Sequence, residues 1–460
     1  MKAEEGLYGR DRAAGTRVRG SVPLWVALLA SLVLGASRTA GANGAFPDSL
    51  GILLPADRPG EIFLATNFGL IWSQDEGKTW SWSCEQTVAS LANLYQVGPP
   101  PVDRIFAISS SGLIYSNDKS CNWSIAGGTL ANAPVTDAFA DPTEPTRVLA
   151  IGSANSTDGS GGSIYASTDG GVTFGPPLFT APAGNLLTGV ELARSDPKIV
   201  YATMVETPGT HPRLLRSADG GQTWDAPLDV EAQLGPNTPR IIAVDPSDPR
   251  KIFLRVSKAL GEILAVSSDG GTSFQTPVKV AFELTAFARL ASGTILVAGT
   301  DSDPKGNQIA AGYRSTDGGS TFRPWPVPRL RALAERNGEL YGAADDLKDQ
   351  FALGVSTDEG RTFTPLMTYD KVTSVMGCVQ AVCAESCRTE ASQGLWSASV
   401  CSTSNDGTDN VAENGCACGA AGRADLSGLA FVAVVAWRRR KRGATRPTQR
   451  PAAQRMPGRT

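Results

Sequence analysis

Short apolar runs separated by polar turns fill most of this chain, and one polar octet returns along it. Its best-formed copy reads Ser-Thr-Asp-Gly-Gly-Ser-Thr-Phe at 315–322, and apolar runs such as Leu70–Trp72 come just before other copies. In each octet the aspartate can accept backbone N–H groups and the glycine tolerates a positive φ. A strand, a tight turn and a strand that opens on an aromatic residue predict a β-hairpin at every octet.

Seven octets are present, 41–51 residues apart. In the second copy, Ser120 replaces the turn glycine and Asn122 replaces the threonine, but the spacing and the closing Trp123 fit. Such a period is typical of repeat architectures such as β-propellers. The octets begin at Ser73, Ser116, Ser167, Ser217, Ser267, Ser315 and Ser356. Their aspartates are Asp75, Asp118, Asp169, Asp219, Asp269, Asp317 and Asp358.

Each repeat contains the material for four strands. In the fifth repeat the apolar run Ile241–Val244 is followed by an Asp/Pro turn, a second run at Ile252–Leu254, the octet, and Gln275–Val280. Fifty glycines and thirty prolines suit an all-β chain with many turns. We therefore predict an all-β, seven-bladed propeller of four-stranded blades over residues 46–377, with inner strands such as Ile241–Val244 lining a central channel.

The octets resemble the Asp-box (BNR) repeat. The run Pro239–Pro249, which leads into Lys251–Leu254, is similar to that of sortilin-like and photosystem-assembly-factor-like propellers. The resemblance covers about Ser49 to Val375. It implies that the seven aspartates are structural and that the octets lie away from any active site.

Both ends of the chain carry signals of export and sorting. Basic residues precede the apolar run Leu24–Leu34, and Ala40–Ala42 is a small-x-small cleavage site, so residues 1–42 are predicted to be a signal peptide. The run is shorter than the ~20 residues that a spanning helix needs. Cys416 and Cys418, a short apolar run at Leu426–Trp437 and an Arg cluster follow near the C-terminus.

This C-terminal order resembles the MYXO-CTERM sorting signal of myxobacterial surface proteins. The resemblance implies cleavage by a sorting protease near Cys416 or Cys418, a lipid on the retained cysteine, and membrane attachment at the cell surface or outer envelope. The signal is assigned to 416–442. Residues 402–415, which are polar and rich in Asp, Asn and Gly, are predicted to be a linker. A basic disordered tail is predicted at 443–460, where the chain continues farther than the family usually does. An ordinary weak C-terminal anchor is the alternative.

Export permits disulfides, so the remaining six cysteines are read in that light. Cys378, Cys383, Cys387 and Cys401 lie in a segment, 378–401, that breaks the β pattern, and they predict two disulfides with three possible connectivities. A metal site is disfavoured because no histidine lies nearby and no paired C-x-x-C units occur. Cys84 and Cys121 are predicted to bridge adjacent blades.

Charge and residue types narrow the chemistry. Residues 43–415 hold 26 basic and 41 acidic side chains, near −15, which argues against nucleic-acid binding. The single histidine, His211, is predicted to lie in a solvated loop. Histidine-dependent triads and His-ligated metals are therefore disfavoured, and no cofactor or metal is expected.

A glycoside hydrolase is the alternative function, because some glycosidases carry these repeats. The resemblance to sialidases would imply a Tyr nucleophile, a supporting Glu, an Asp and three arginines that grip a carboxylate. In the expected position the mature chain has only Arg58, in a turn, while Arg216, Arg240 and Arg314 form no recognisable triad. A xyloglucanase-like enzyme would need two carboxylates facing each other across two propellers.

The sequence therefore predicts a surface-anchored binding module for protein or polysaccharide, or a scaffolding factor of the envelope. A glycoside hydrolase is the alternative. An exposed apolar or aromatic face would favour binding. Inner-strand carboxylates converging with a Tyr–Glu pair would favour the enzyme.

Overall fold

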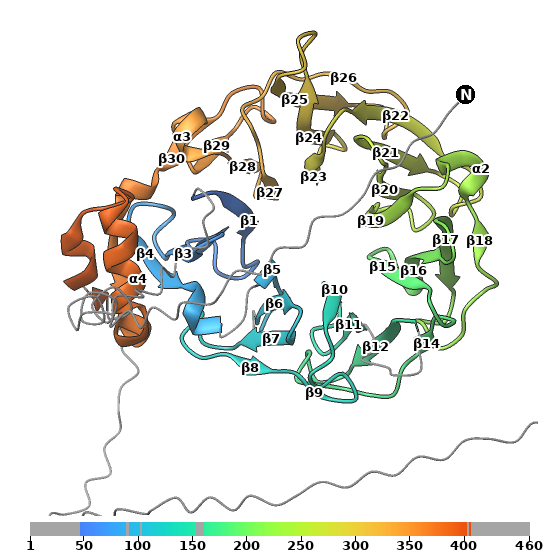
Figure 1. Ribbon diagram of the computed structural model, residues 1–460, viewed down its shortest axis with the longest axis horizontal. Helices are drawn as coiled ribbons and strands as arrows, with labels where there is room; N and C mark the ends of the chain where they lie inside the picture. Colours follow the sequence, from blue (N-terminus) through green and yellow to red (C-terminus); the bar gives the residue numbers. More distant parts are fainter. Residues whose placement is uncertain (1–46, 89–91, 102–103, 153–160, 403, 406–460) are drawn as a thin grey trace, which may run out of the picture. The chain divides into compact units, whose positions relative to one another are not determined.

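The computed structural model describes residues 47–405, except 89–91, 102–103, 153–160 and 403. The predicted signal peptide, the sorting cysteines Cys416 and Cys418, the basic tail and nearly all of the linker lie outside these residues. The described residues form seven four-stranded antiparallel blades of a propeller; six of them are separate sheets, and the first belongs to a larger sheet (Figure 1). The predicted fold class is therefore confirmed.

Every blade is built from one continuous stretch of chain, whose first strand is innermost and whose fourth strand is outermost. Blade 1 contains β1 (Ser49–Leu53), β2 (Ile62–Thr66), β3 (Gly69–Ser73) and β4 (Trp80–Cys84), and blade 2 contains β5 (Ala92–Val97), β6 (Ile105–Ser109), β7 (Gly112–Ser116) and β8 (Ser124–Ile125). Blade 3 contains β10 (Val135–Ala140), β11 (Val148–Gly152), β12 (Ser163–Ser167) and β14 (Phe179–Thr180). Blade 4 contains β15 (Leu186–Ala193), β16 (Asp196–Glu206), β17 (His211–Ser217) and β18 (Leu228–Asp229).

Blades 5–7 follow the same order. Their strands are β19 (Thr238–Val244), β20 (Ile252–Ser257), β21 (Glu262–Ser267), β22 (Gln275–Val280); β23 (Leu284–Arg289), β24 (Ile295–Ser302), β25 (Gln308–Ser315), β26 (Arg323–Pro324); and β27 (Ala332–Arg336), β28 (Glu339–Ala343), β29 (Leu353–Ser356), β30 (Thr364–Met367). The smaller elements are η1 (Glu85–Val88), the parallel pair β9 (Gly127–Gly128) and β13 (Thr173–Phe174), α2 (Glu231–Leu234) and α3 (Asp346–Asp349).

The antiparallel order gives the propeller two distinct faces. The octets join third to fourth strands, so they lie on the same face as the turns between first and second strands; we call this the octet face. The loops between second and third strands and the connections from blade to blade lie on the other side, here named the opposite face. The second strands β2, β6 and β11 are buried along their whole length, because they pack between neighbouring blades.

After β30 the chain crosses to the outer edge of blade 1 and forms a segment that we call the clasp, Tyr369–Asn405. It consists of η2 (Tyr369–Lys371), β31 (Val372–Met376), η3 (Gly377–Val379), α4 (Gln380–Ser392), η4 (Ala398–Ser402) and β32 (Ser404–Asn405). Strand β31 pairs in parallel with β4, and β32 pairs in parallel with β31, so the sheet of blade 1 has six strands.

All six cysteines of the described chain form disulfides, but the pairing differs from the predicted one. Cys84 bonds to Cys383 and Cys121 bonds to Cys378, while Cys387 and Cys401 form the one bridge internal to the clasp. The predictions of two internal bridges and of blade-to-blade bonds by Cys84 and Cys121 are wrong. The reason is the parallel pairing of β31 with β4, which brings Cys383 to a Cα–Cα distance of 5.5 Å from Cys84.

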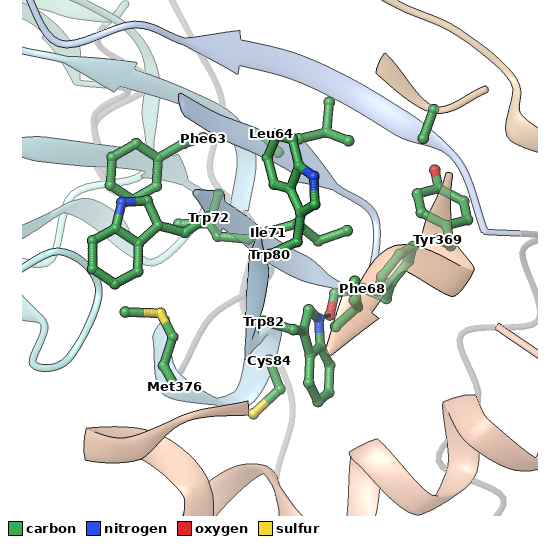
Figure 2. Close-up of a cluster of buried hydrophobic side chains, with 14 of the residues drawn as sticks. Phe63, Leu64, Phe68, Ile71, Trp72, Trp80, Trp82, Cys84, Tyr369 and Met376 are labelled. Carbon is green, nitrogen blue, oxygen red and sulfur yellow. Dashed lines mark hydrogen bonds between the residues drawn. The ribbon is translucent and has the colours of Figure 1, made fainter. Parts of the chain in front are cut away.

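The core beneath the clasp is aromatic. Figure 2 shows Phe68 between Trp82 and Tyr369, with Cys84 next to Trp82, and all four belong to one buried cluster. The ring of Phe68 meets that of Tyr369 edge-on at 5.2 Å between centroids, and Trp82 lies 5.1 Å from Trp396. This cluster joins side chains of blade 1, of blade 7 and of the clasp.

We expect Trp82→Ala to lower the free energy of unfolding by about 3–5 kcal/mol, because it leaves a cavity at a fully buried site. Urea denaturation of purified protein measures this loss. Ile125→Ala on β8 is the matched control, since its side chain is 50% exposed, and it should cost under about 0.5 kcal/mol. Equal losses in the two variants would contradict this description of the core.

Candidate functional site

The seven octet aspartates all lie in hairpin turns on the octet face, and the fourth octet shows their shared hydrogen bonds. The hydroxyl of Ser217 donates to Asp219 Oδ1 over 2.8 Å and accepts the N–H of Gly221 over 2.8 Å. The N–H of Thr223 donates to Asp219 Oδ1 over 2.8 Å, and its hydroxyl donates to Oδ2 over 2.6 Å. The carboxylate is thus occupied within its own turn.

The second octet keeps this arrangement despite its altered sequence. The side-chain amide of Asn122 donates to Asp118 Oδ2 over 2.7 Å and so replaces the usual threonine hydroxyl. Ser120 adopts a φ of 77° in place of glycine, and its N–H donates to Ser116 Oγ over 3.0 Å. The turn depends on its hydrogen bonds and on a positive φ angle. Asn122 supplies the hydrogen bond and Ser120 supplies the φ angle.

The octets also receive side chains from the preceding blade. Arg147, on blade 3, donates to the carbonyl oxygen of Gly220 in the fourth octet over 2.9 Å. Arg104, on blade 2, donates to the Asp169 carbonyl oxygen in the third octet over 3.3 Å and also to that of Gly170. These arginine–carbonyl hydrogen bonds therefore join each of the two octets to the preceding blade.

These contacts set the electrostatics of the turns. The Thr223 hydroxyl and amide hold the pKa of Asp219 at about 2, below its usual value of 3.8. Thr362 lowers the pKa of Asp358 in the same way. Each such carboxylate stabilises the folded state above the unfolded pKa and loses that effect as the pH falls through the folded pKa.

We expect Asp219→Ala to lower the Tm at pH 7, because it removes the acceptor for both donors of Thr223. The Tm difference from wild type should shrink as the pH falls from about 4 toward 2, where the wild-type carboxylate takes up its proton. Calorimetry at several pH values measures it. Asp225→Ala, at an exposed carboxylate nearby, is the control. A pH-independent difference would contradict this role of the carboxylate.

The arginines considered for substrate binding have separate partners. Arg240 pairs with Asp137 over 2.9 Å, and Arg58 pairs with Glu61 over 3.1 Å. Arg314 pairs with Glu359 in the seventh octet. The charge of Arg216 lies near the Tyr201 hydroxyl and opposes the rise that burial causes in its pKa.

His211 is the first residue of β17 and does not lie in a loop as expected. Its Nδ1 lies 2.7 Å from Glu231 Oε2, and its side chain is half-exposed.

Sequence reasoning missed two carboxyl groups on neighbouring inner strands, Asp137 on β10 and Glu191 on β15. Asp137 is buried and accepts the N–H of Val190 over 2.9 Å, while half-buried Glu191 accepts the N–H of Val244 over 2.8 Å. Each therefore binds the inner strand of the next blade, β15 or β19. The signal in the sequence was an acidic residue inside an apolar strand pattern, as in Val190-Glu191-Leu192.

Burial raises the pKa of Glu191 to about 8, and the nearby Asp137 adds to the rise, although the Val244 amide opposes it. Burial also raises the pKa of Asp137, against the attraction of Arg240. Tyr201 is in register with Glu191 on β16, but its hydroxyl donates to the Pro249 carbonyl oxygen over 3.0 Å. The two carboxyl groups therefore lack the Tyr–Glu pair expected of the enzyme alternative.

We expect Glu191→Gln to raise the Tm relative to wild type increasingly between about pH 5 and pH 8. The wild-type carboxyl keeps its proton up to about pH 8 when folded but loses it near 4.5 when unfolded, so its contribution falls across this window. Glutamine cannot ionise and can still accept the Val244 N–H. Thermal unfolding across pH measures the effect. The exposed Glu385→Gln on α4 is the control, and a difference that is flat with pH would refute the assignment.

Large apolar side chains are exposed mainly on the opposite face. Leu260 and Leu347, in loops between second and third strands, are 87% and 68% exposed, and Leu186 at the start of β15 is 58% exposed. Seven of the ten such side chains in the described residues lie in opposite-face connections or in the first half of a first or third strand. They are Leu50, Leu94, Leu186, Leu260, Phe282, Ile309 and Leu347.

Three of these side chains are neighbours on blades 5 and 6. Phe282 donates its N–H to the Thr300 carbonyl oxygen over 3.3 Å, which places it beside the end of β24. Ile309 on β25 is in register with Asp301 of that strand, and Asp301 Oδ1 accepts the N–H of Ala281 over 2.9 Å. Gly261, next to Leu260, lies against Val280 and Ala281. Leu260, Phe282 and Ile309 thus form one exposed group, which we call the blade 5–6 patch.

Metal-binding clusters and membrane-spanning helices are absent from the described part of the chain. In it, no group of three or more His, Cys, Asp or Glu side chains is placed to hold a metal ion. Nor does any described helix have the length and apolar character to cross a membrane.

Comparison with known proteins finds distant structural similarities only. No protein-family model matches the sequence, and no curated protein matches it. Among solved structures, the GH74 enzyme of Niastella koreensis aligns over 70% of this chain and 66% of its own, at 14% identity and a TM-score of 0.40. An ancestral GH74 enzyme aligns over 71% of this chain but 55% of its own, at 12% identity and 0.42. This chain thus spans less than two thirds of the length of both enzymes.

Two further similar structures are not described as GH74 enzymes. YCF48 from Cyanidioschyzon merolae aligns over 65% of this chain and 94% of its own, at 14% identity and a TM-score of 0.45. The propeller domain of the Trilobed protease from Pyrococcus furiosus aligns over 71% and 99%, at 9% identity and 0.45.

Proposed function

We propose that this protein is an exported, surface-anchored propeller that acts as a binding or scaffolding module and holds a protein or polysaccharide on its opposite face. The observation that carries the proposal is that seven of the ten exposed large apolar side chains of the described residues lie on this face, three of them in the blade 5–6 patch. Exposed apolar groups of this kind mark interaction sites on soluble domains, because water favours their burial by a partner.

The octet face offers less to a ligand. Its aspartates are occupied by their own turns, and octet carbonyl groups such as that of Gly220 accept arginine from the preceding blade. A ligand there would have to compete with the bonds that hold blades together. In the blade 5–6 patch of the opposite face, the side chain of Leu260 is largely exposed and takes no part in joining blades.

The proposed location rests on the sequence and on the disulfides. The predicted signal peptide at 1–42 would deliver the chain to an oxidising compartment, in which three disulfides are stable. A sorting protease acting near Cys416 or Cys418 would then leave a lipid-bearing cysteine that attaches the protein to the membrane.

A glycoside hydrolase is the second candidate, and the pair Asp137 and Glu191 favours it. Glycosidases use one carboxyl group with a raised pKa as the acid and a second carboxylate as base or nucleophile. Here both groups are on adjacent inner strands, and the pKa of Glu191 is raised to about 8.

We expect the purified protein to bind a component of a glycan array or of a solubilised envelope-protein fraction, and Leu260→Glu combined with Phe282→Glu to weaken that binding at least tenfold. The reason is that a charge at each position opposes burial of the blade 5–6 patch. The control is Gln222→Glu, at an exposed position of the fourth octet, which should bind as wild type. Binding lost only in the octet variant would overturn the assignment of the face.

A panel of fluorogenic glycosides tests the second candidate with the same preparations. Turnover that is present in wild type and absent in both Asp137→Asn and Glu191→Gln would favour the hydrolase. If the blade 5–6 variant hydrolyses as wild type while these two do not, catalysis and the patch are separate.

A further inference from the structure

The seam between blades 7 and 1 is built differently from the other six. Elsewhere the chain runs directly from the last strand of one blade to the inner strand of the next. At this seam it runs from β30 to β31, which lies on the outer strand of blade 1. The sheet of blade 1 contains strands from both ends of the described chain, because β31 pairs with β4, so backbone hydrogen bonds of that sheet help to close the ring. The chain itself does not join blade 7 to the inner strand of blade 1.

The direct contacts across the seam are polar at its opposite-face end, and side chains of blades 7 and 1 also share an apolar core. Ser49 Oγ on β1 donates to the Ala352 carbonyl oxygen over 3.2 Å, and Arg331 pairs with Asp48 over 2.9 Å. At the octet-face end of the seam, Arg336 donates to the Glu61 carbonyl oxygen over 2.7 Å. The clasp must supply whatever covalent link this seam has.

Helix α4 is held to the propeller mainly through its cysteines. Of its thirteen residues, the two that are buried are Cys383 and Cys387. Cys383 is bonded to Cys84 at the end of β4, and Cys387 to Cys401 within the clasp. The rest of this helix is rich in Ala, Ser, Glu and Thr, so it offers little apolar area to hold it against blade 1 once the thiols are free.

A second bridge ties the clasp to blade 2. Cys378 just after β31 is bonded to Cys121 in the second octet. Cys378 is exposed and Cys121 half-buried, whereas Cys84 and Cys383 are buried. The two bridges thus join blade 7, through the clasp, to both blades 1 and 2, and one of them is open to a thiol reagent.

We propose that oxidation of these two cysteine pairs locks the propeller, and that the ring can open between blades 7 and 1 while the four thiols are reduced. Each bridge forms when two thiols lose two protons and two electrons to a disulfide oxidant, such as oxidised glutathione, which leaves as two thiols. Before oxidation, opening this seam requires only the loss of non-covalent contacts. The other six seams stay joined by the chain itself.

Hydrogen exchange with mass spectrometry on the full chain tests this proposal. In a variant that carries Cys84→Ala, Cys383→Ala, Cys121→Ala and Cys378→Ala, peptides from β1 and β27 should exchange at least tenfold faster than in wild type. Peptides from β15 and β19, at the seam between blades 4 and 5, should change less than twofold. The matched control, Cys387→Ala with Cys401→Ala, removes the bridge inside the clasp and should leave β1 and β27 protected.

A second measurement covers the case in which the fourfold variant does not accumulate. Folded wild-type protein is reduced with dithiothreitol in native buffer, alkylated with iodoacetamide, and followed by the same exchange experiment. Faster exchange confined to β1, β27 and the clasp is the expected result. Unchanged protection at β1 and β27, or equal loss of protection at all seven blades, would overturn the proposal in either experiment. Neither outcome depends on what the opposite face binds.

Discussion

Burial between neighbouring blades is the interaction on which the whole molecule depends. Each blade is a small twisted sheet whose apolar faces are covered only by the blades on either side, as the buried second strands β2, β6 and β11 show. A single blade would leave its apolar faces exposed to water, because one repeat cannot bury them by itself. Every blade therefore depends on both of its neighbours and on the ring remaining closed.

Two sets of polar contacts also hold neighbouring blades together. On the octet face, Arg147 and Arg104 reach into the octet of the next blade. Between inner strands, Asp137 and Glu191 accept N–H groups of the next blade. These polar groups are buried or half-buried, so leaving any of them without a partner would cost free energy, and this favours one arrangement of the blades.

The sequence predicted what is encoded locally and repeated. The octets contain their own turn chemistry, and their spacing gave seven blades of four strands, which the structure confirms. The pairing of Cys84 with Cys383 depends on a contact between residues 299 apart, which no local pattern encodes. Asp137 and Glu191 were missed for the same reason, because their partners belong to other blades. A hairpin is determined by residues close together in the sequence, whereas a site depends on residues that come from different blades.

The separation of the two faces has a consequence for how such a protein can change. Residues that shape each hairpin lie on the octet face, while Leu260 and Leu347 lie in loops that take no part in those turns. Substitution or lengthening of an opposite-face loop leaves the hydrogen bonds of all seven octets intact. A library of variants at these loops would therefore sample new surfaces on a constant framework, which makes this propeller a suitable scaffold for selecting binders.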